Sequence, residues 1–101
     1  MSNEIKPIAE CKTLQELFAD PKRWTQGAMA KDEQGKTTYI CTNAAVCFCL
    51  AGGLSKVYPD GDARIVSVKK IRVEIGDMVD WNDDPKRSAR DVQDLVAKLN
   101  I

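Results

Sequence analysis

The sequence predicts a mainly α fold, a small helical domain of about four helices, and three observations support this class. With 101 residues, the chain can bury one hydrophobic core but is short for two, so residues 1–101 are expected to form a single domain. Apolar side chains recur at helical spacing in three segments, and a capping signal precedes each segment. The alternative is an α+β domain with a short hairpin or strand in residues 63–80. We expect residues 1–10 to be flexible.

The first predicted helix begins after Thr13. Thr13 and Glu16 have the spacing of a capping box, in which the hydroxyl and the carboxylate each accept a hydrogen bond from a free backbone N–H. The apolar residues of one helix face are Leu14, Leu17 and Phe18. Pro21 is expected to end the helix, because the residue before a proline is disfavoured in the α conformation.

Residues 24–35 follow and are rich in glycine and turn-forming residues. This composition predicts a loop rather than a long regular element. Asp32 to Gly35 has the pattern of a four-residue turn, in which the aspartate accepts from the backbone and the glycine takes a positive φ.

The second predicted helix is capped by Thr42 or Asn43 and ends near Tyr58, ahead of a Pro-Asp-Gly turn. Its apolar positions are Val46, Cys49, Leu50, Gly53, Leu54 and Val57. Gly52 and Gly53 each cost about 1 kcal/mol relative to alanine inside a helix. We therefore expect these glycines to let another backbone or a tryptophan ring approach closely.

Residues 62–75 fit two structures. Charged residues alternate there with Ile71, Val73 and Ile75, as in a strand, and the many β-branched residues favour that choice. A helix fits as well, with Asp62 as its N-cap and an ion pair between Lys70 and Glu74. The pattern alone leaves both open.

The last predicted helix begins after Ser88. Ser88 and Asp91 resemble a capping box with aspartate in place of glutamate. A clean apolar stripe follows at Val92, Leu95, Val96 and Leu99. This helix is expected to pack on the core.

Charge and composition exclude several classes of function. Lysine plus arginine and aspartate plus glutamate number 15 each, so no overall field draws the chain to nucleic acid or to an anionic membrane. The chain has no histidine, which removes nucleophile–histidine catalysis. Carboxylate or lysine chemistry stays open, but no motif indicates it, and we predict no catalytic residue and no cofactor.

The cysteines and the apolar segments bear on metal binding and location. The four cysteines are Cys11, Cys41, Cys47 and Cys49, which we expect to be reduced, buried and not bound to metal. The longest apolar run, residues 44–54, is about half the length that crosses a bilayer. The first residues lack the pattern of a secretory signal. We expect a cytoplasmic protein, in a bacterium or in an infected host.

Three local motifs together resemble a known family. They are Trp24-x-x-Gly27-x-x-Ala30-x-Asp32, then Cys49-Leu50-Ala51-Gly52-Gly53-Leu54, and finally Trp81-Asn82-Asp83 before the last helix. In this order and spacing they resemble a family of small bacterial and phage proteins whose domain has no known function. Gly53 replaces the alanine of that pattern, and the segment after Tyr58 looks more strand-like than the helix of the relatives. The resemblance implies a bacterial or phage origin and supplies no substrate.

Two readings apply to the Trp-Asn-Asp motif. In the structural reading, Asn82 and Asp83 bond to nearby N–H groups, and Trp81 fills the space above Gly52 and Gly53. In the functional reading, aromatic walls and polar groups surround one pocket for a small molecule or peptide. The residues of that candidate site are Trp24, Gln26, Asp32, Trp81, Asn82 and Asp83.

Charged residues form two kinds of local cluster. The acidic residues are Glu74, Asp77, Asp80, Asp83 and Asp84, which do not match the calcium loop of an EF-hand and are expected to form a solvated acidic surface. The basic residues are Lys69, Lys70, Arg72, Lys86, Arg87 and Arg90, which are expected to be solvated faces of helices.

The leading functional hypothesis is a small non-catalytic protein-binding module, in the form of a phage-encoded inhibitor or regulator of a host or defence complex (anti-CRISPR-like). Small size, the lack of a catalytic constellation and the phage members of the resembling family motivate it. One alternative is a small-ligand-binding protein or carboxylate-based enzyme that uses a pocket near Trp24 and Trp81. Another alternative is weak nucleic-acid binding, which the zero net charge disfavours.

Overall fold

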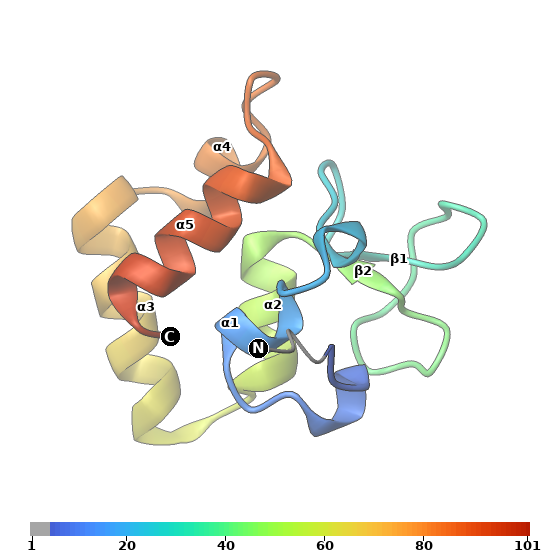
Figure 1. The fold of residues 1–101 in the computed structure, drawn as a ribbon, viewed down its shortest axis with the longest axis horizontal. Helices are drawn as coiled ribbons and strands as arrows, with labels where there is room; N and C mark the ends of the chain where they lie inside the picture. Colours follow the sequence, from blue (N-terminus) through green and yellow to red (C-terminus); the bar gives the residue numbers. More distant parts are fainter. Residues whose placement is uncertain (1–4) are drawn as a thin grey trace.

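The computed structural model describes residues 5–101. Figure 1 shows its elements in chain order. They are η1 (Ile8–Glu10), α1 (Leu14–Leu17), η2 (Pro21–Arg23), β1 (Ala30–Lys31), β2 (Cys47–Phe48), α2 (Leu50–Val57), α3 (Gly61–Ile75), α4 (Met78–Asn82) and α5 (Ala89–Leu99). The mainly α prediction is confirmed. Part of the expected flexible segment, residues 1–4, lies outside the described residues, and Ile8 of η1 packs against the core.

Helices α1, α2 and α5 supply half of the buried apolar core residues. Their buried apolar side chains form one cluster that also takes in Ile71 of α3 and Phe48 of β2. In Figure 1, α1 and α2 lie between the α3–α5 side of the molecule and the β1–β2 side. No helix within residues 5–101 has the length and apolar character that crossing a membrane requires.

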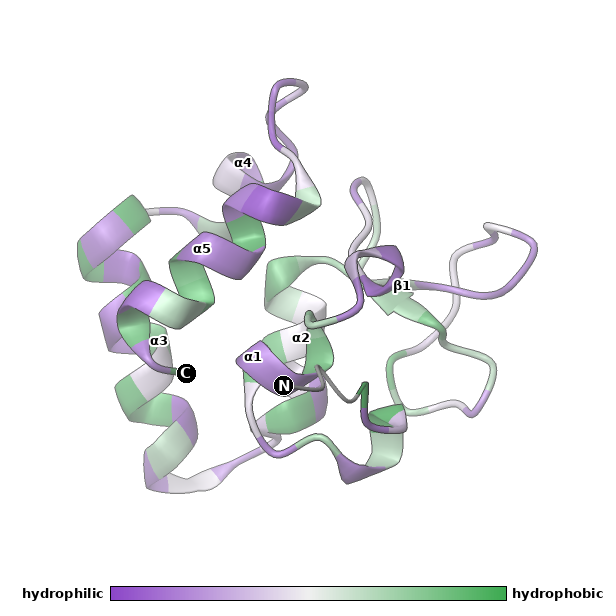
Figure 2. Ribbon diagram, in the orientation of Figure 1, coloured by the Kyte–Doolittle hydropathy of each residue, from purple (hydrophilic) through white to green (hydrophobic). Residues whose placement is uncertain are grey.

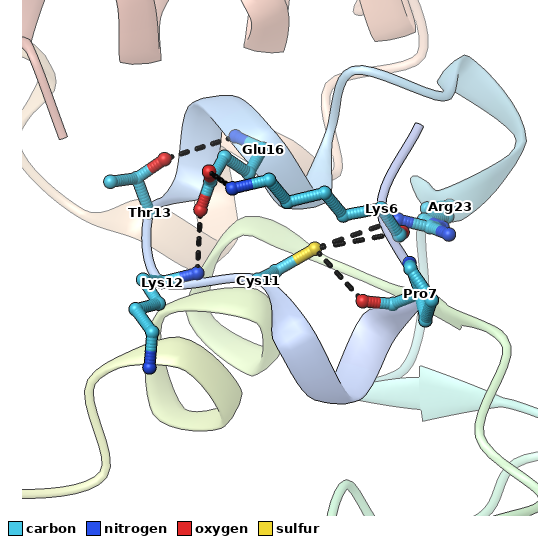
Figure 3. A network of polar contacts seen from close by, with 7 residues as sticks. All are labelled: Lys6, Pro7, Cys11, Lys12, Thr13, Glu16 and Arg23. Atoms are coloured by element: carbon cyan, nitrogen blue, oxygen red, sulfur yellow. Dashed lines mark hydrogen bonds and ion pairs between the residues drawn. The ribbon is translucent and has the colours of Figure 1, made fainter. Parts of the chain in front are cut away.

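Helix α1 begins as predicted. The Thr13 hydroxyl accepts from the Glu16 N–H at 3.1 Å, and the Glu16 carboxylate accepts from the Lys12 N–H at 2.7 Å. Figure 3 shows that Glu16 also meets the Lys6 ammonium, while the Cys11 thiol donates to the Pro7 carbonyl. The Glu16 carboxylate therefore links Lys6 and Lys12, which precede α1, to the first turn of the helix.

Helix α2 is shorter than predicted, and neither Thr42 nor Asn43 caps it. The preceding Cys47 and Phe48 form strand β2, which pairs antiparallel with β1, Ala30 opposite Phe48. Since this pairing holds the backbone extended and buries Phe48, the helix starts only at Leu50. The sequence pattern missed the strand because two residues are too few to show an alternation.

The two glycines of α2 permit the predicted close approach, but the ring involved is not a tryptophan. A Cβ on Gly52 would lie 1.9 Å from the Met29 carbonyl oxygen, so the loop backbone passes directly over this residue. A Cβ on Gly53 would lie 2.7 Å from Phe18 Cζ. The space above the glycines is thus filled by Met29 and Phe18 rather than by Trp81.

Residues 61–75 and 78–82 are helical, so the strand alternative for residues 63–80 is wrong. The N-cap of α3 is Asp60 rather than Asp62. The predicted pair of Lys70 and Glu74 does not form, because Lys98 of α5 reaches Glu74 at 2.6 Å. Docking of α3 against its neighbours outweighs the strand preference of its β-branched residues. Helix α4 is additional to the helices that the sequence predicted.

Helix α5 confirms its predicted cap. The Ser88 hydroxyl accepts from the Asp91 N–H at 3.3 Å, and the Asp91 carboxylate accepts from the Ser88 N–H at 3.0 Å. Val92, Leu95 and Val96 are buried. This helix closes one side of the core, as the stripe predicted.

Candidate functional site

The Trp-Asn-Asp motif is organised around the side chain of Asn82, which is completely buried. Its Oδ1 accepts from Trp24 Nε1 at 2.7 Å and from the Leu50 N–H at 2.9 Å. Its Nδ2 donates to the Thr25 carbonyl at 3.1 Å and to Asp83 Oδ1 at 3.0 Å. Both donors and both acceptor directions of the amide are therefore used.

Two neighbouring side chains extend this arrangement. Gln26 donates through Nε2 to the carbonyls of Asn82 at 2.9 Å and Asp84 at 2.8 Å. Asp83 Oδ1 accepts from the Gly27 N–H at 3.1 Å. We call the residues Trp24, Gln26, Asn82 and Asp83 the Asn82 bracket. It joins the loop after η2, the first turn of α2 and the end of α4.

Asn82 and Asp83 accept from backbone N–H groups, but the donors are Leu50 and Gly27, which are distant in the sequence and not the neighbours that a local turn would supply. The Leu50 N–H is one of the donors at the start of α2 that has no partner inside the helix. Asn82 provides that partner from a distant element. The Asn82 amide, the Trp24 indole N–H and the Gln26 Nε2 group are bonded to protein atoms, so these groups are already occupied where a ligand would need them.

The other two residues of the predicted site lie differently. Trp81 is half-buried, and Arg87 covers it, with its guanidinium carbon 4.0 Å from the ring centre and its Nε donating to the Trp81 carbonyl at 2.8 Å. Asp32 forms the predicted turn, where it accepts from the N–H groups of Gln34 and Lys36 at 2.9 Å. Asp32 therefore does not belong to the Asn82 bracket.

A small cavity of about 180 Å³ adjoins the bracket. Its lining comes from residues 27–29 together with Cys49, Val79 and Asp83. Neither tryptophan lines it. Burial raises the pKa of the Cys49 thiol, and this outweighs the hydrogen bond from the Gly52 N–H to the sulfur. A protonated thiol is a weak nucleophile, so the cavity holds no activated group of that kind.

A second, apolar hollow of about 490 Å³ lies beside the β1–β2 pairing. Met29 and residues 37–40 line it, and Tyr39 within it is 80% exposed. All four cysteines are free thiols. Cys11 and Cys49 are buried as predicted, but Cys47 is half-buried and Cys41 is exposed, because Cys41 lies in the long loop between the strands.

The predicted acidic surface is divided among separate local roles. Glu74 pairs with Lys98, Asp77 caps α4 by accepting from the Asp80 N–H, and Asp84 pairs with Arg87 at 3.8 Å. Within the described part of the chain, no three histidine, cysteine, aspartate or glutamate side chains are grouped so as to hold a metal ion.

The predicted basic residues separate into those that contact other groups of the chain and those that are exposed without an ion pair in residues 5–101. Arg87 stacks on Trp81, Arg90 pairs with Asp94 at 3.0 Å, and Lys70 donates to the Leu99 carbonyl at 3.2 Å. Lys86 is exposed. Lys69 and Arg72 are exposed on α3 and form no ion pair within residues 5–101.

Helix α3 presents an apolar face that the core does not cover. Of its 15 residues only Ser67 and Ile71 are buried. On the opposite side the exposed fractions are 54% for Ile65, 50% for Val66 and 89% for Val73. Figure 1 shows α3 at the edge of the molecule, and Figure 2 shows hydrophobic bands alternating with hydrophilic ones along it.

We call Ile65, Val66, Lys69, Arg72 and Val73 the α3 outer face. The sequence alone did not predict this face, because the pattern of residues 62–75 fits both a helix and a strand. The signal was present, since a helix over 61–75 has apolar residues on two opposite sides, and one core can cover only one of them.

Comparison with protein families gives one match. Residues 12–99 match the model of DUF6197, described as a family of unknown function. No curated protein and no solved structure matches the chain.

Proposed function

The chain belongs to the DUF6197 family, and we propose that it is a non-catalytic protein-binding module that engages its partner through the α3 outer face. The observation that carries the proposal is the exposure of Ile65, Val66 and Val73 on a helix that the core meets along one narrow stripe. Exposed apolar residues that lie together among charges are typical of protein interaction sites.

The internal bonding of the Asn82 bracket supports a binding role over a catalytic one. A small-ligand protein or carboxylate enzyme near Trp24 and Trp81 needs polar groups free to meet a substrate. Instead, Asn82 Oδ1 and Gln26 Nε2 form hydrogen bonds with other atoms of the protein. Nucleic-acid binding has less support as well, because Lys70, Arg87 and Arg90 already have partners within the chain.

In its specific form, the proposal is a phage-encoded inhibitor or regulator of a host or defence complex, acting in the cytoplasm. The four free thiols support a reducing compartment. Genomic position tests the origin independently of the surface. A gene beside anti-defence genes supports this form, whereas a gene beside metabolic genes contradicts it.

Site-specific photocrosslinking tests the proposed surface. A photoreactive amino acid at Val73 is compared with the same group at Ala97, which is exposed on α5 and serves as the matched control. We expect one specific protein adduct from position 73 and none from position 97. The adduct should disappear in Val66→Asp, a change on the same face. Equal labelling from both positions would show that the α3 outer face is not the binding surface.

A further inference from the structure

We infer that the α3 outer face docks an acidic amphipathic helix of a partner protein. This inference rests on the proposed function and adds the chemistry of the partner. The alternatives are a second copy of this chain and an anionic membrane surface. The arrangement of charges within the α3 outer face favours the acidic helix over these two alternatives.

The face has a defined pattern along the helix. Val66 and Val73 are seven residues apart, so they lie on one side about 10 Å apart along the axis. Lys69 lies between them on the same side, and Ile65, Lys69 and Arg72 form a second row beside the first. A partner helix that packs along this face would contact an apolar side chain every second turn, at Val66 and Val73, and the Lys69 ammonium between them.

The charges on the face lack acidic partners among residues 5–101. Lys69 and Arg72 are both exposed, and in residues 5–101 no carboxylate pairs with either. Asp62 lies in the first turn of α3, one turn before Val66. Its negative charge interacts favourably with the free N–H groups at the start of the helix. The centre of the face is therefore basic, and a carboxylate on the partner complements it.

A symmetric pair of α3 helices fits this pattern poorly. In a two-fold antiparallel pair, the residues midway between Val66 and Val73 face their own copies across the axis. Those residues are Lys69 and Lys70. Like charges at the centre of an interface are repulsive, and this disfavours a second copy as the occupant.

A membrane surface fits less well than a helix. Helices that lie in a membrane interface carry Trp, Phe or Leu on the inserted face and keep their cations on the opposite, polar face. The α3 outer face has short β-branched side chains, and its cations lie among them. The opposite side of α3 packs on the protein core through Ile71.

A displayed peptide library tests the inference with the full chain as bait. The library holds amphipathic helices with a fixed leucine stripe and randomised flanking positions. Selection on the wild-type chain is followed by counter-selection on Val66→Asp/Val73→Asp. We expect the enriched flanks to be rich in Glu and Asp. We also expect the best peptide to bind Lys69→Glu/Arg72→Glu at least tenfold more weakly, with binding restored when its acidic flanks become lysine.

Three results would overturn the inference, each in a different direction. Peptides with neutral or basic flanks, or no enrichment over the counter-selected variant, would refute the acidic partner. In that case a crosslink from position 73 would still support the α3 outer face as the binding surface. A concentration-dependent dimer in sedimentation, lost in Val73→Asp, would identify a second copy as the occupant. Co-sedimentation with phosphatidylserine vesicles, lost in Lys69→Glu/Arg72→Glu, would identify a membrane.

Discussion

The indole Nε1 of Trp24 donates a hydrogen bond to Oδ1 of Asn82, 2.7 Å away and 58 residues later in the chain. The same oxygen accepts from the Leu50 N–H at the start of α2. One amide thus connects the two tryptophan-containing motifs to the glycine helix between them. The three motifs of the sequence therefore meet at a single buried side chain.

Replacing Asn82 with alanine should destabilise the fold strongly. Trp24 Nε1, the Leu50 N–H and the Thr25 carbonyl would all lose their partner. Because each unsatisfied buried group costs about 1–3 kcal/mol, we expect a loss of roughly 3 kcal/mol or more in the free energy of unfolding. Urea unfolding measures it. Asn43→Ala, at an exposed loop asparagine, is the control and should change stability by less than about 0.5 kcal/mol.

Replacing Gly52 with alanine should destabilise the chain even though alanine favours helices. Helix propensity alone predicts a gain of about 1 kcal/mol. The new Cβ would lie 1.9 Å from the Met29 carbonyl oxygen, and backbone cannot move aside without disturbing the β1–β2 pairing. Gly53→Ala is the comparison, since its Cβ would meet the side chains of Phe18 at 2.7 Å and Leu17 at 3.0 Å rather than backbone atoms. Calorimetry that finds Gly52→Ala as stable as wild type would contradict the close approach.

Local signals in the sequence predicted the starts of two helices, α1 and α5. The caps at Thr13 and Ser88 depend on residues three positions apart, and the structure has both. Helix α2 was placed too early because β2 is only two residues long and is held by pairing with Ala30 and Lys31. That pairing is tertiary, and no local pattern encodes it.

The candidate site was also predicted only in part, because the sequence pattern does not show which distant side chains bond to one another. Motif order brought Trp24, Gln26, Asn82 and Asp83 into one group, and the structure joins them by hydrogen bonds. Asp32 was grouped with them by its place in a motif, but its carboxylate bonds to its own turn. The exposed side of α3 became visible only once the segment was known to be helical.

Glu16 should make stability depend on pH in the acidic range. The hydrogen bond from Lys6, followed by that from the Lys12 N–H, lowers the pKa of this carboxyl below its ordinary value. A lowered folded-state pKa contributes stability above the unfolded pKa, and the contribution is lost as pH falls toward the folded value. We therefore expect wild type to be more stable than Glu16→Gln at neutral pH and the two to converge on acidification. Glu33→Gln, in the exposed turn, is the control, and a gap that persists at low pH would contradict this role.

The four free thiols should react in an order set by their burial. Cys41 is exposed and should react first with a thiol reagent under native conditions, so Cys41→Ser should remove the fast phase. Burial raises the pKa of Cys11 and Cys49, which lowers their thiolate fraction at any given pH and slows them further. Cys49 precedes Leu50, whose N–H bonds to Asn82, so loosening the bracket should uncover this thiol. Asn82→Ala should thus accelerate Cys49 more than Cys11, as mass spectrometry of the labelled peptides would measure. Equal acceleration of both would mean that the variant opens the whole fold rather than the start of α2.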